Sequence, residues 1–553
     1  MIYIISLPPI NIKKVSILIF LIVSYFLLSI SLYLLFPKAG VEAVKGLIPG
    51  VNFMEWCKLI GRKPSHALWL LFPIVNLFIF AAMAVDLVRS FGKLQFKHTA
   101  AAVIYAPAIF FKLAKTPEDK YIGPTIIREA EYAKSLEEAK AAGDAYRLKQ
   151  LEEKNPYKKS IAREWVESIV FAVFAAAFIR MFLIEAYVIP TPSMEGSLNV
   201  GDFLFVSKAH YGIRTPMTIA MIPLLHNQIP IINKESYLSK PSLNYHRFPA
   251  LEKIEAGKPI VFNWPVGDSV YITSSRSYFV SQIERQPEYI QQDRELLSKV
   301  QNKDFVVRPL DKKDHYIKRC VAGPGDSLMI IDRQLYLNGK AVKNPKHLQY
   351  LYQIQLPQNI SINNKKLDQW GIDIGDNAAG GSQLFVGGQA YLHLDNEQVE
   401  RLKSMDANVV VQPYPHLPEP TKLFPFDTII GKNWSLDNYG PIWIPKSGVT
   451  TNLNIHNLAF YRRIIEVYEQ NTVEIKGQDI YINGKKADNY TFKQDYYWAM
   501  GDNRHNSEDS RAWGYVPFDH IVGKPLFIWF STKEGNIRNG INWDRLFMSA
   551  SKE

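Results

Sequence analysis

Residues 165–194 read WVESIVFAVFAAAFIRMFLIEAYVIPTPSM, and they divide the chain into two parts of different character. Residues 165–184 are almost continuously apolar, and about 20 such residues suffice to cross the hydrocarbon core of a membrane. Glu167 and Arg180 lie near the ends of this run, where long charged side chains reach the polar surface. We therefore predict a transmembrane anchor over residues 165–185.

Before this anchor, residues 1–114 contain further apolar segments at 15–36, 67–88 and 99–113. The first segment is too long for a secretory signal peptide, whose apolar region spans about 7–15 residues. The third is short and contains Pro107, so a re-entrant or interfacial segment is an alternative to a full span. The pattern predicts an N-terminal α-helical membrane module with about three apolar segments.

Residues 115–164 form a charged linker rich in Ala, Glu, Lys and Leu. This composition predicts a soluble helix, interrupted near Gly143. Positive charge beside a span favours the cytoplasmic side, and four basic residues crowd the start of the anchor: Lys154, Lys158, Lys159 and Arg163. We therefore expect a cytoplasmic linker and an extracytoplasmic domain over residues 186–553. The basic residues around the second and third segments leave the side of the N-terminus open.

After Glu185, short β-branched and aromatic runs alternate with Gly, Pro, Asn and Asp clusters, which predicts a mostly-β domain. Expected strands include residues 203–206, 259–262, 328–331 and 480–482. RQLYLNGKAV at 333–342 and QDIYINGKKA at 478–487 each place Asn-Gly between apolar residues, a strong signal for a β-hairpin. Residues 345–425 carry no evident chemistry and are interpreted as an inserted module.

Composition narrows the classes of function. Hydrophobic residues make up 47% of the 553 residues and charged residues 21%, which excludes a disordered chain. The net charge is +11, but no compact basic stripe with interleaved aromatic residues is evident, so nucleic acid is not an expected partner. The two cysteines cannot build a disulfide framework, and the 12 histidines show no ligand spacing such as His-Glu-x-x-His. We expect no metal and no cofactor.

Three polar runs carry the candidate chemistry. In IPTPSM (189–194), two prolines fix the backbone on either side of Thr191, close to the end of the anchor. YIKRCV (316–321) is a strand-like run with two basic residues inside it, and GDNRHNSEDSRAWG (501–514) is a dense polar loop.

The basic pair in the second run suggests a catalytic base. By strand alternation, Lys318 and Arg319 lie on opposite faces, so one of them should point inward. Burial lowers the pKa of a lysine, and a neutral amine can act as a base near neutral pH. A serine hydroxyl needs such a base to become nucleophilic, and no histidine lies in a plausible run near Ser193. Cys320 is more simply explained as a small buried strand residue.

Together these runs, in this order, resemble the type I signal peptidases, the membrane-bound Ser-Lys peptidases that remove signal peptides. Gly201-Asp202 and Gly323-Pro324-Gly325-Asp326 extend the match, and the extra spans and insertions suggest an enlarged form. The resemblance implies that Ser193 is the nucleophile and Lys318 the general base. It implies that the Thr191 hydroxyl joins the Ser193 N–H in the oxyanion hole and that the Ser507 hydroxyl hydrogen-bonds the Lys318 amine. It assigns to Asp509 and Arg511 a structural ion pair that supports the loop around Ser507. It assigns the shallow apolar substrate pockets to Ile189, Met194, Leu198, Tyr316 and Ile317.

The same resemblance implies a signal-peptidase-like β fold and exported preproteins with Ala-x-Ala-like cleavage sites as substrates. It also implies a multi-pass protein of the bacterial cytoplasmic membrane, in contact with the lipid bilayer, whose catalytic domain faces the periplasm. Pro192 stands where the family commonly has glycine, and His505 where it has an acidic residue. A catalytically inactive membrane scaffold that retains the fold is the alternative. The sequence leaves the oligomeric state open.

Overall fold

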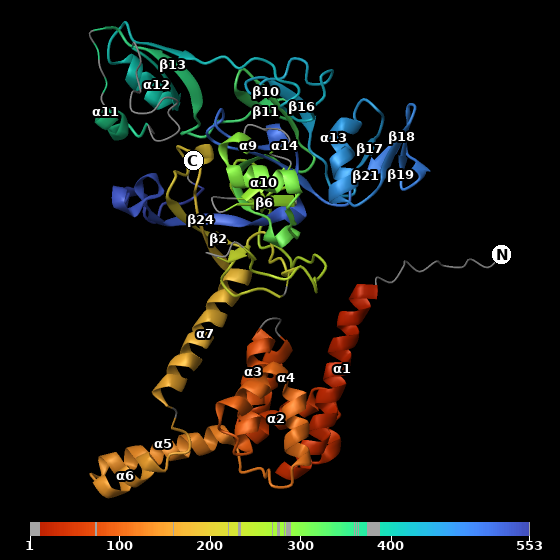
Figure 1. Ribbon diagram of the computed structural model, residues 1–553, viewed down its shortest axis with the longest axis vertical. Coiled ribbons are helices and arrows are strands. Elements are labelled where there is room, and N and C mark those ends of the chain that lie inside the picture. The colour runs from red at the N-terminus through yellow and green to blue at the C-terminus, as the bar shows by residue number, and fades with distance from the viewer. Residues whose placement is uncertain are drawn as a thin grey trace, which may run out of the picture. The chain divides into compact units, whose positions relative to one another are not determined.

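A computed structural model of the chain divides into two compact units, Met1–Ile169 and Val170–Glu553. The residues that it describes are 12–71, 75–158, 160–218, 220–229, 234–267, 269–273, 277–280, 283, 289–358, 360, 362, 364–372 and 388–551. The first unit is helical and the second is mostly β, as the sequence predicts (Figure 1).

The first unit is built around Trp56, which is fully buried and packs edge-on against the rings of Phe80 and Phe110. Its indole N–H donates to the Met83 carbonyl oxygen at 3.1 Å, so the polar edge of this large side chain is satisfied inside the core. The helices are α1 (Ile12–Leu35), α2 (Val51–Ile60), α3 (Val75–Ser90), α4 (Phe96–Lys115), α5 (Thr125–Ala141) and α6 (Ala145–Glu153), with the start of α7 (Ile161–Phe182).

Two helical segments of the described chain are long and apolar enough to cross a membrane, Ile22–Ala39 and α7. No residue of α7 is buried by protein, as expected for a helix whose apolar side chains face lipid. The predicted second segment, 67–88, is not one helix in the described residues. It is divided between a 3-10 helix at Pro64–Leu71 and α3, which at 16 residues falls short of a span.

The predicted third segment lies in α4, whose helical geometry breaks at Tyr105, with φ −157° and ψ 88°. Pro107 is two residues further on, and proline disfavours helical geometry in the chain just before it. In the linker, the predicted interruption at Gly143 is confirmed. Gly143 has φ +67° between α5 and α6, and the Asp144 carboxylate caps α6 by accepting from the Arg147 N–H at 2.9 Å.

A seven-stranded sheet in the order β1-β2-β24-β5-β9-β22-β23 forms the centre of the second unit. Neighbouring strands in this order are antiparallel. All five residues of β5 and all five of β22 are buried, which explains why these strands read as continuous apolar runs. The strands are β1 (Ile184–Val188), β2 (Asp202–Ser207), β5 (Pro259–Asn263), β9 (His315–Ala322), β22 (Tyr496–Met500), β23 (Val516–Pro517) and β24 (Ile521–Ser531).

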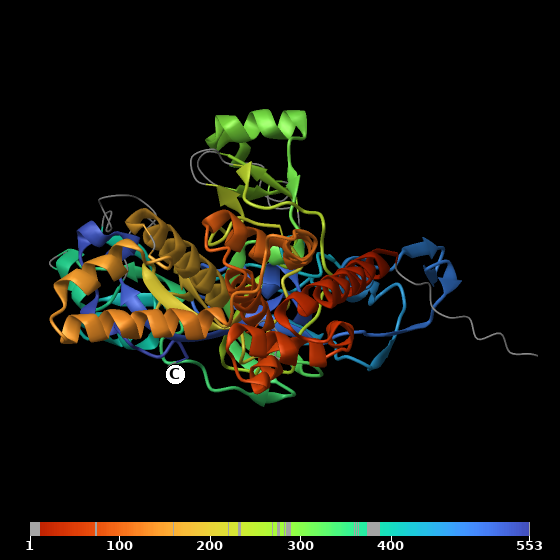
Figure 2. The same ribbon diagram turned by 90° about the horizontal axis from the view of Figure 1, so that it is seen from below.

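Smaller sheets surround the central one. Strands β6 (Ser269–Ile272), β7 (Ser277–Phe279) and β8 (Val306–Val307) pack with α10 (Arg294–Asn302) as a lobe that stands out at the top of Figure 2. The other strands are β3 (Gln228–Ile229), β4 (Lys234–Glu235), β10 (Ser327–Ile331), β11 (Gln334–Leu337), β12 (Lys340–Ala341), β16 (Tyr439–Trp443), β17 (Thr450–Asn452), β18 (Val473–Lys476), β19 (Asp479–Ile482), β20 (Lys485–Lys486) and β21 (Asn489–Thr491). Outside residues 345–425, this unit also contains the α-helices α9 (Tyr289–Gln292), α13 (Leu458–Arg463) and α14 (Ser510–Trp513).

Both predicted hairpins are confirmed. Strands β11 and β12 are joined at Asn338-Gly339, and β19 and β20 at Asn483-Gly484. The two asparagines have φ 51° and both glycines φ 77°, the left-handed geometry that this residue pair accepts.

The predicted inserted module contains a hydrophobic core of its own, with Ile354, Leu367, Leu394 and Leu402 fully buried. Its elements are β13 (Tyr350–Gln355), β14 (Gln389–Leu394), β15 (Val410–Pro413), α11 (Asn364–Gln369) and α12 (Asn396–Lys403). The strands form one antiparallel sheet in the order β14-β13-β15.

Candidate functional site

Ser193 lies on a short 3-10 turn, Pro192–Met194, in the connection between β1 and β2. Thr191 before it is extended, with φ −135° and ψ 151°. Two backbone hydrogen bonds, from the Ile189 N–H to the Asp202 carbonyl oxygen at 2.9 Å and from the Gly201 N–H to the Ile189 carbonyl oxygen at 3.0 Å, close the base of this loop. The loop therefore presents Ser193 from a fixed frame.

Lys318 lies on β9, opposite Ile260 of β5. Its Nζ is 2.7 Å from the Ser193 Oγ and 3.1 Å from the Ile317 carbonyl oxygen. The exposed fraction is 3% for Lys318 and 9% for Ser193. Burial lowers the pKa of Lys318 to about 8, although the carboxylates of Asp509, Glu508 and Asp502 act in the opposite direction. A buried amine is thus within hydrogen-bond distance of a serine hydroxyl.

The burial of Arg319, next to Lys318, differs from the prediction. Only one of these two basic residues was expected to point inward. Arg319 is also 3% exposed. Its guanidinium donates to both oxygens of Asp502, at 2.8 and 2.6 Å, and to the Gly257 carbonyl oxygen at 2.5 Å. The consecutive residues 318–322 of β9 are all buried, so both faces of this part of the strand are covered. Asp502 supplies the charge partner that makes burial of an arginine tolerable.

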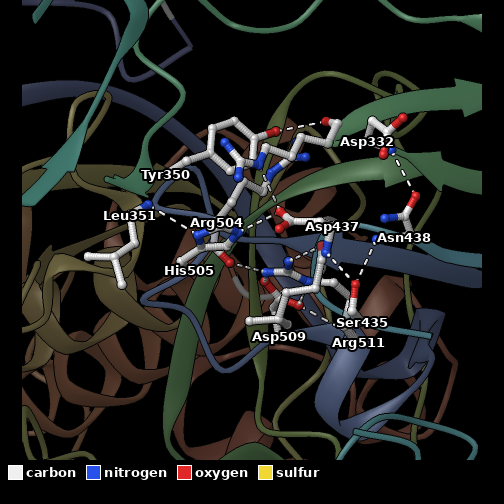
Figure 3. Close-up of polar contacts among 12 residues, drawn as sticks. Asp332, Tyr350, Leu351, Ser435, Asp437, Asn438, Arg504, His505, Asp509 and Arg511 are labelled. Carbon is white, nitrogen blue, oxygen red and sulfur yellow. Dashed lines mark hydrogen bonds and ion pairs between the residues drawn. The ribbon is translucent and has the colours of Figure 1, made fainter. Parts of the chain in front are cut away.

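The polar loop 501–514 is organised by Asp509 and Arg511 (Figure 3). The Arg511 guanidinium donates to both carboxylate oxygens of Asp509, at 2.9 and 2.8 Å, and to the Arg504 carbonyl oxygen at 2.6 Å. Burial opposes the charge on Asp509, but Arg511 and the Gly501 N–H outweigh it and lower the pKa of this carboxyl. The predicted ion pair is therefore present and fully buried.

Ser507 lies near Ser193, but the predicted hydrogen bond between its hydroxyl and the Lys318 amine is not formed. Its hydroxyl is buried and has no hydrogen-bond partner among the described residues. A Cβ on Gly501 would lie 2.2 Å from the Ser507 Oγ and 2.4 Å from the Ser193 carbonyl oxygen, so only glycine fits between the two serines. The Asn503 N–H donates to the same Ser193 carbonyl at 3.2 Å. Asn503 thus contacts Ser193 directly, and Asp502 contacts Arg319, the neighbour of Lys318. Their position in a dense polar run was the only signal for these contacts in the sequence.

The predicted pocket residues divide between two clusters. Ile189, Met194 and Leu198 are 1–3% exposed and share a cluster against which Ile317 packs. Tyr316 belongs to the neighbouring cluster, where its ring centroid lies 4.3 Å from that of Trp264, but Lys318 Nζ is 5.7 Å from the centroid of the Tyr316 ring. The Thr191 Oγ1 is 3.4 Å from the Ser193 Oγ, on the exposed side of the loop.

Residues 345–425, the predicted inserted module, are attached directly to the polar loop. Gln349 and Asn503 form a parallel bridge, and the Leu351 N–H donates to the His505 Nδ1 at 3.1 Å (Figure 3). The other ring nitrogen of His505 is 2.8 Å from the Asp437 carboxylate. His505, which departs from the family pattern, therefore links the module to the loop that carries Asp509.

Comparison with known proteins identifies the family to which the chain is similar. The model of the family "Signal peptidase, peptidase S26" matches residues 162–432 and 488–530, more than half of the chain. The chain is 24% identical to signal peptidase I of Buchnera aphidicola subsp. Baizongia pistaciae, covering 68% of this chain and 80% of the relative. It is 23% identical to signal peptidase I of Helicobacter pylori, covering 70% and 90%.

A third relative, signal peptidase I of Haemophilus influenzae, is 25% identical over 70% of this chain and 76% of its own length. Residues 44–124 match a second model, a family of unknown function (DUF5684). The match to the peptidase family begins at the start of α7 and covers the loop of Ser193, strand β9 and the polar loop 501–514. The chain belongs to the signal peptidase family, peptidase S26.

Proposed function

We propose that this chain is a membrane-bound serine endopeptidase that removes signal peptides from exported preproteins through a Ser193–Lys318 dyad. The observation that carries this proposal is the 2.7 Å approach of a buried lysine amine to a buried serine hydroxyl, in a chain of the signal peptidase family. The intact pair argues against the inactive scaffold.

The dyad performs both proton transfers. Neutral Lys318 Nζ accepts the proton of Ser193 as its Oγ attacks the carbonyl carbon of the scissile peptide bond. As the tetrahedral intermediate collapses, the C–N bond breaks and the lysine returns the proton to the leaving amine, which becomes the N-terminus of the mature protein. Water then attacks the acyl-Ser193 ester and gives a proton to Lys318. As this second intermediate collapses, the ester C–O bond breaks and Lys318 returns the proton to the Ser193 Oγ, so the signal peptide leaves with a free carboxylate and the dyad is regenerated.

The oxyanion site is assigned to the Ser193 backbone N–H and the Thr191 hydroxyl. The Thr191 Oγ1 lies 3.4 Å from the nucleophilic oxygen and is on the exposed side of the loop, where the substrate carbonyl would arrive. Each such donor typically contributes about 3–4 kcal/mol to transition-state stabilisation.

The polar loop has a positioning role in this proposal. Asp509 and Arg511 hold the loop, and through Gly501 and Asn503 the loop holds the Ser193 carbonyl. A buried hydroxyl without a partner costs about 1–3 kcal/mol, and Ser507 offers this hydroxyl to the amine when Lys318 becomes an ammonium and needs additional acceptors.

We expect the substrate pocket to favour small residues. Ile189, Met194 and Leu198 are buried in one hydrophobic cluster, and a pocket walled by such closely packed side chains would have little room for a large substrate residue. We expect a synthetic precursor peptide with Ala at the first and third positions before the scissile bond to be cut once. Replacing the first of these Ala residues with Leu should lower kcat/KM by roughly 10²-fold, because the larger side chain overfills the pocket.

Mass spectrometry of the products and initial rates for the two peptides test this specificity. A control peptide with the same Ala-to-Leu change six positions after the scissile bond should be cut at the original rate. Equal kcat/KM for the two test peptides would contradict the pocket assignment.

The pKa of Lys318 predicts the pH dependence of cleavage. Only the neutral amine accepts a proton, and its pKa is lowered to about 8. Below this value kcat/KM should rise about tenfold per pH unit, and it should level off above about pH 9. At pH 7, about one tenth of the enzyme would be in the active form. A rate profile that is flat from pH 6 to 9, or that still rises steeply near pH 10.5, would contradict the role of a desolvated lysine base.

Two features support the proposed membrane placement, the helix α7 and the exposed surface of the second unit. Ser193 is eleven residues beyond the end of α7 at Phe182, so even extended chain keeps it within about 40 Å of the bilayer. Exposed aromatic side chains stand on the second unit at Trp529, Trp543 and Phe547, and tryptophan favours the membrane interface. We place the catalytic domain on the periplasmic face of the cytoplasmic membrane of a multi-pass protein, where exported preproteins present their Ala-x-Ala sites.

A further inference from the structure

A second polar site lies where the membrane-spanning helix α7 meets the β domain. It is a pocket lined by Arg180 at the end of α7, by Lys208 and Arg214 beyond β2, and by Asp311 and Lys312 before β9. Its volume is about 90 Å³, whereas one water needs about 10–15 Å³ by the same measure. The pocket therefore has room for a compact polar group of the size of a phosphate.

The charges in this pocket do not balance. Four cations line it, Arg180, Lys208, Arg214 and Lys312, against the two carboxylates of Glu185 and Asp311. Two histidines in the wall, His226 and His315, add no charge at neutral pH, because burial lowers the pKa of His226 to about 4 and also lowers that of His315. The lining thus carries an excess of two positive charges.

Both carboxylates are already engaged. Glu185 accepts from the Arg180 Nε at 2.8 Å, and its other oxygen is 2.7 Å from the Lys208 Nζ. The Asp311 oxygens accept from the Met217 and Thr218 N–H groups at 3.0 and 2.8 Å, and from the Thr218 hydroxyl at 2.8 Å. Among the described residues of the pocket, neither carboxylate forms an ion pair with the other two cations, although the charge of Asp311 acts on both from a greater distance.

Arg214 and Lys312 are those two cations. Arg214 donates to neutral acceptors, the Asp519 carbonyl oxygen at 3.0 Å and the Asn263 side-chain oxygen at 2.8 Å. Lys312 is 4% exposed, and among the described residues the hydrogen-bond partner of its ammonium is the Met221 sulfur at 2.9 Å. A thioether is a weak acceptor. The Tyr237 ring, whose centroid is 5.4 Å from the same Nζ, adds a cation–π contact but no hydrogen bond. A buried ammonium without an oxygen partner is costly. Lys312 therefore marks where an anion is needed.

We propose that this pocket binds the phosphate group of a membrane phospholipid, with Lys312 and Arg214 as its principal ligands. The lipid is favoured as the source because Ala177, Arg180 and Met181 of the pocket wall belong to the apolar helix itself. Phospholipid headgroups lie at the level where such a helix leaves the bilayer, and basic pockets beside spans bind them. The bound headgroup fixes the catalytic domain to the membrane surface at the exit of α7.

The test measures lipid binding, not cleavage, so its result is independent of the proposed function. The full-length protein in detergent is titrated with dihexanoyl phosphatidylglycerol, and the rise of the thermal unfolding midpoint with concentration gives the apparent Kd. Lys312→Met should weaken binding at least about tenfold, because one charge-assisted hydrogen bond is lost. Lys312→Arg should bind within a few-fold of wild type. Lys253→Met, which removes a lysine from an exposed position outside the pocket, should bind like wild type.

The stability of Lys312→Met without lipid distinguishes a binding role from a structural one. Methionine has a similar length and needs no acceptor, so this variant should unfold at a higher temperature than wild type when lipid is absent. If Lys312 served only to stabilise the fold, Lys312→Met would instead unfold at a lower temperature than wild type. The proposal is overturned if Lys312→Met binds the lipid like wild type or unfolds at a lower temperature. It is overturned equally if dihexanoylglycerol, which lacks the phosphate, binds as tightly, or if inorganic phosphate matches the lipid in affinity.

Discussion

Replacing Ser193 with alanine is expected to lower kcat for cleavage of a precursor peptide by at least about 10³-fold, while the protein inserts and folds normally. No described hydroxyl other than that of Ser193 lies within hydrogen-bond distance of the Lys318 amine. Without it, the amine has no proton to accept, and cleavage falls to the level that binding and the oxyanion donors alone provide. Initial rates with a labelled precursor, and mass spectrometry of the products, measure the loss.

A matched control separates the nucleophile from general effects of the same substitution. Ser447 is exposed, and its hydroxyl donates only to the Lys493 carbonyl oxygen at 3.2 Å. Ser447→Ala should turn over like wild type and unfold at nearly the same temperature. A Ser193→Ala protein that retains a tenth or more of the wild-type rate would show that another group attacks the peptide bond.

Local patterns predicted the parts of this molecule that depend on a few neighbouring residues. Asn-Gly specified both hairpins, and the break at Gly143 was visible because glycine is a poor residue inside a helix. The apolar runs of α7 and β5 were equally plain. These features arise from the backbone preferences of single residues and from the spacing of apolar residues, and both can be read directly from the sequence.

Features that depend on distant partners could not be predicted in the same way. Alternation put one of Lys318 and Arg319 outward, but Asp502, 183 residues from Arg319, allows both to be buried. Likewise the inserted module showed no chemistry in sequence, yet Gln349 and Leu351 hold Asn503 and His505. Nothing at residues 345–425 could have indicated this contact, because its partners come from a loop about 150 residues later in the chain.

Lys318 is buried and lies near three carboxylates, so its replacement by arginine is the sharpest test of the mechanism. Arginine keeps the positive charge and enough length to reach Ser193, and the nearby carboxylates of Asp502, Glu508 and Asp509 would still face a cation. A guanidinium, however, stays protonated in proteins and cannot accept the serine proton. Lys318→Arg should therefore lose at least about 10³-fold in kcat/KM, as much as Lys318→Met, which is of similar length but uncharged.

Comparison of these two variants decides what the lysine does. If Lys318 acted only through its charge, arginine would preserve cleavage and methionine would abolish it. If it acts as the base, both variants fail at every pH, and the rise of activity through about pH 8 disappears with them. Lys446 is an exposed lysine of the same unit, and Lys446→Arg should keep both the rate and the pH profile of wild type. In the proposed mechanism, the 2.7 Å contact between Lys318 and Ser193 serves proton transfer to a neutral amine, and arginine cannot provide a neutral amine. Substantial cleavage by Lys318→Arg would therefore exclude a proton-accepting lysine.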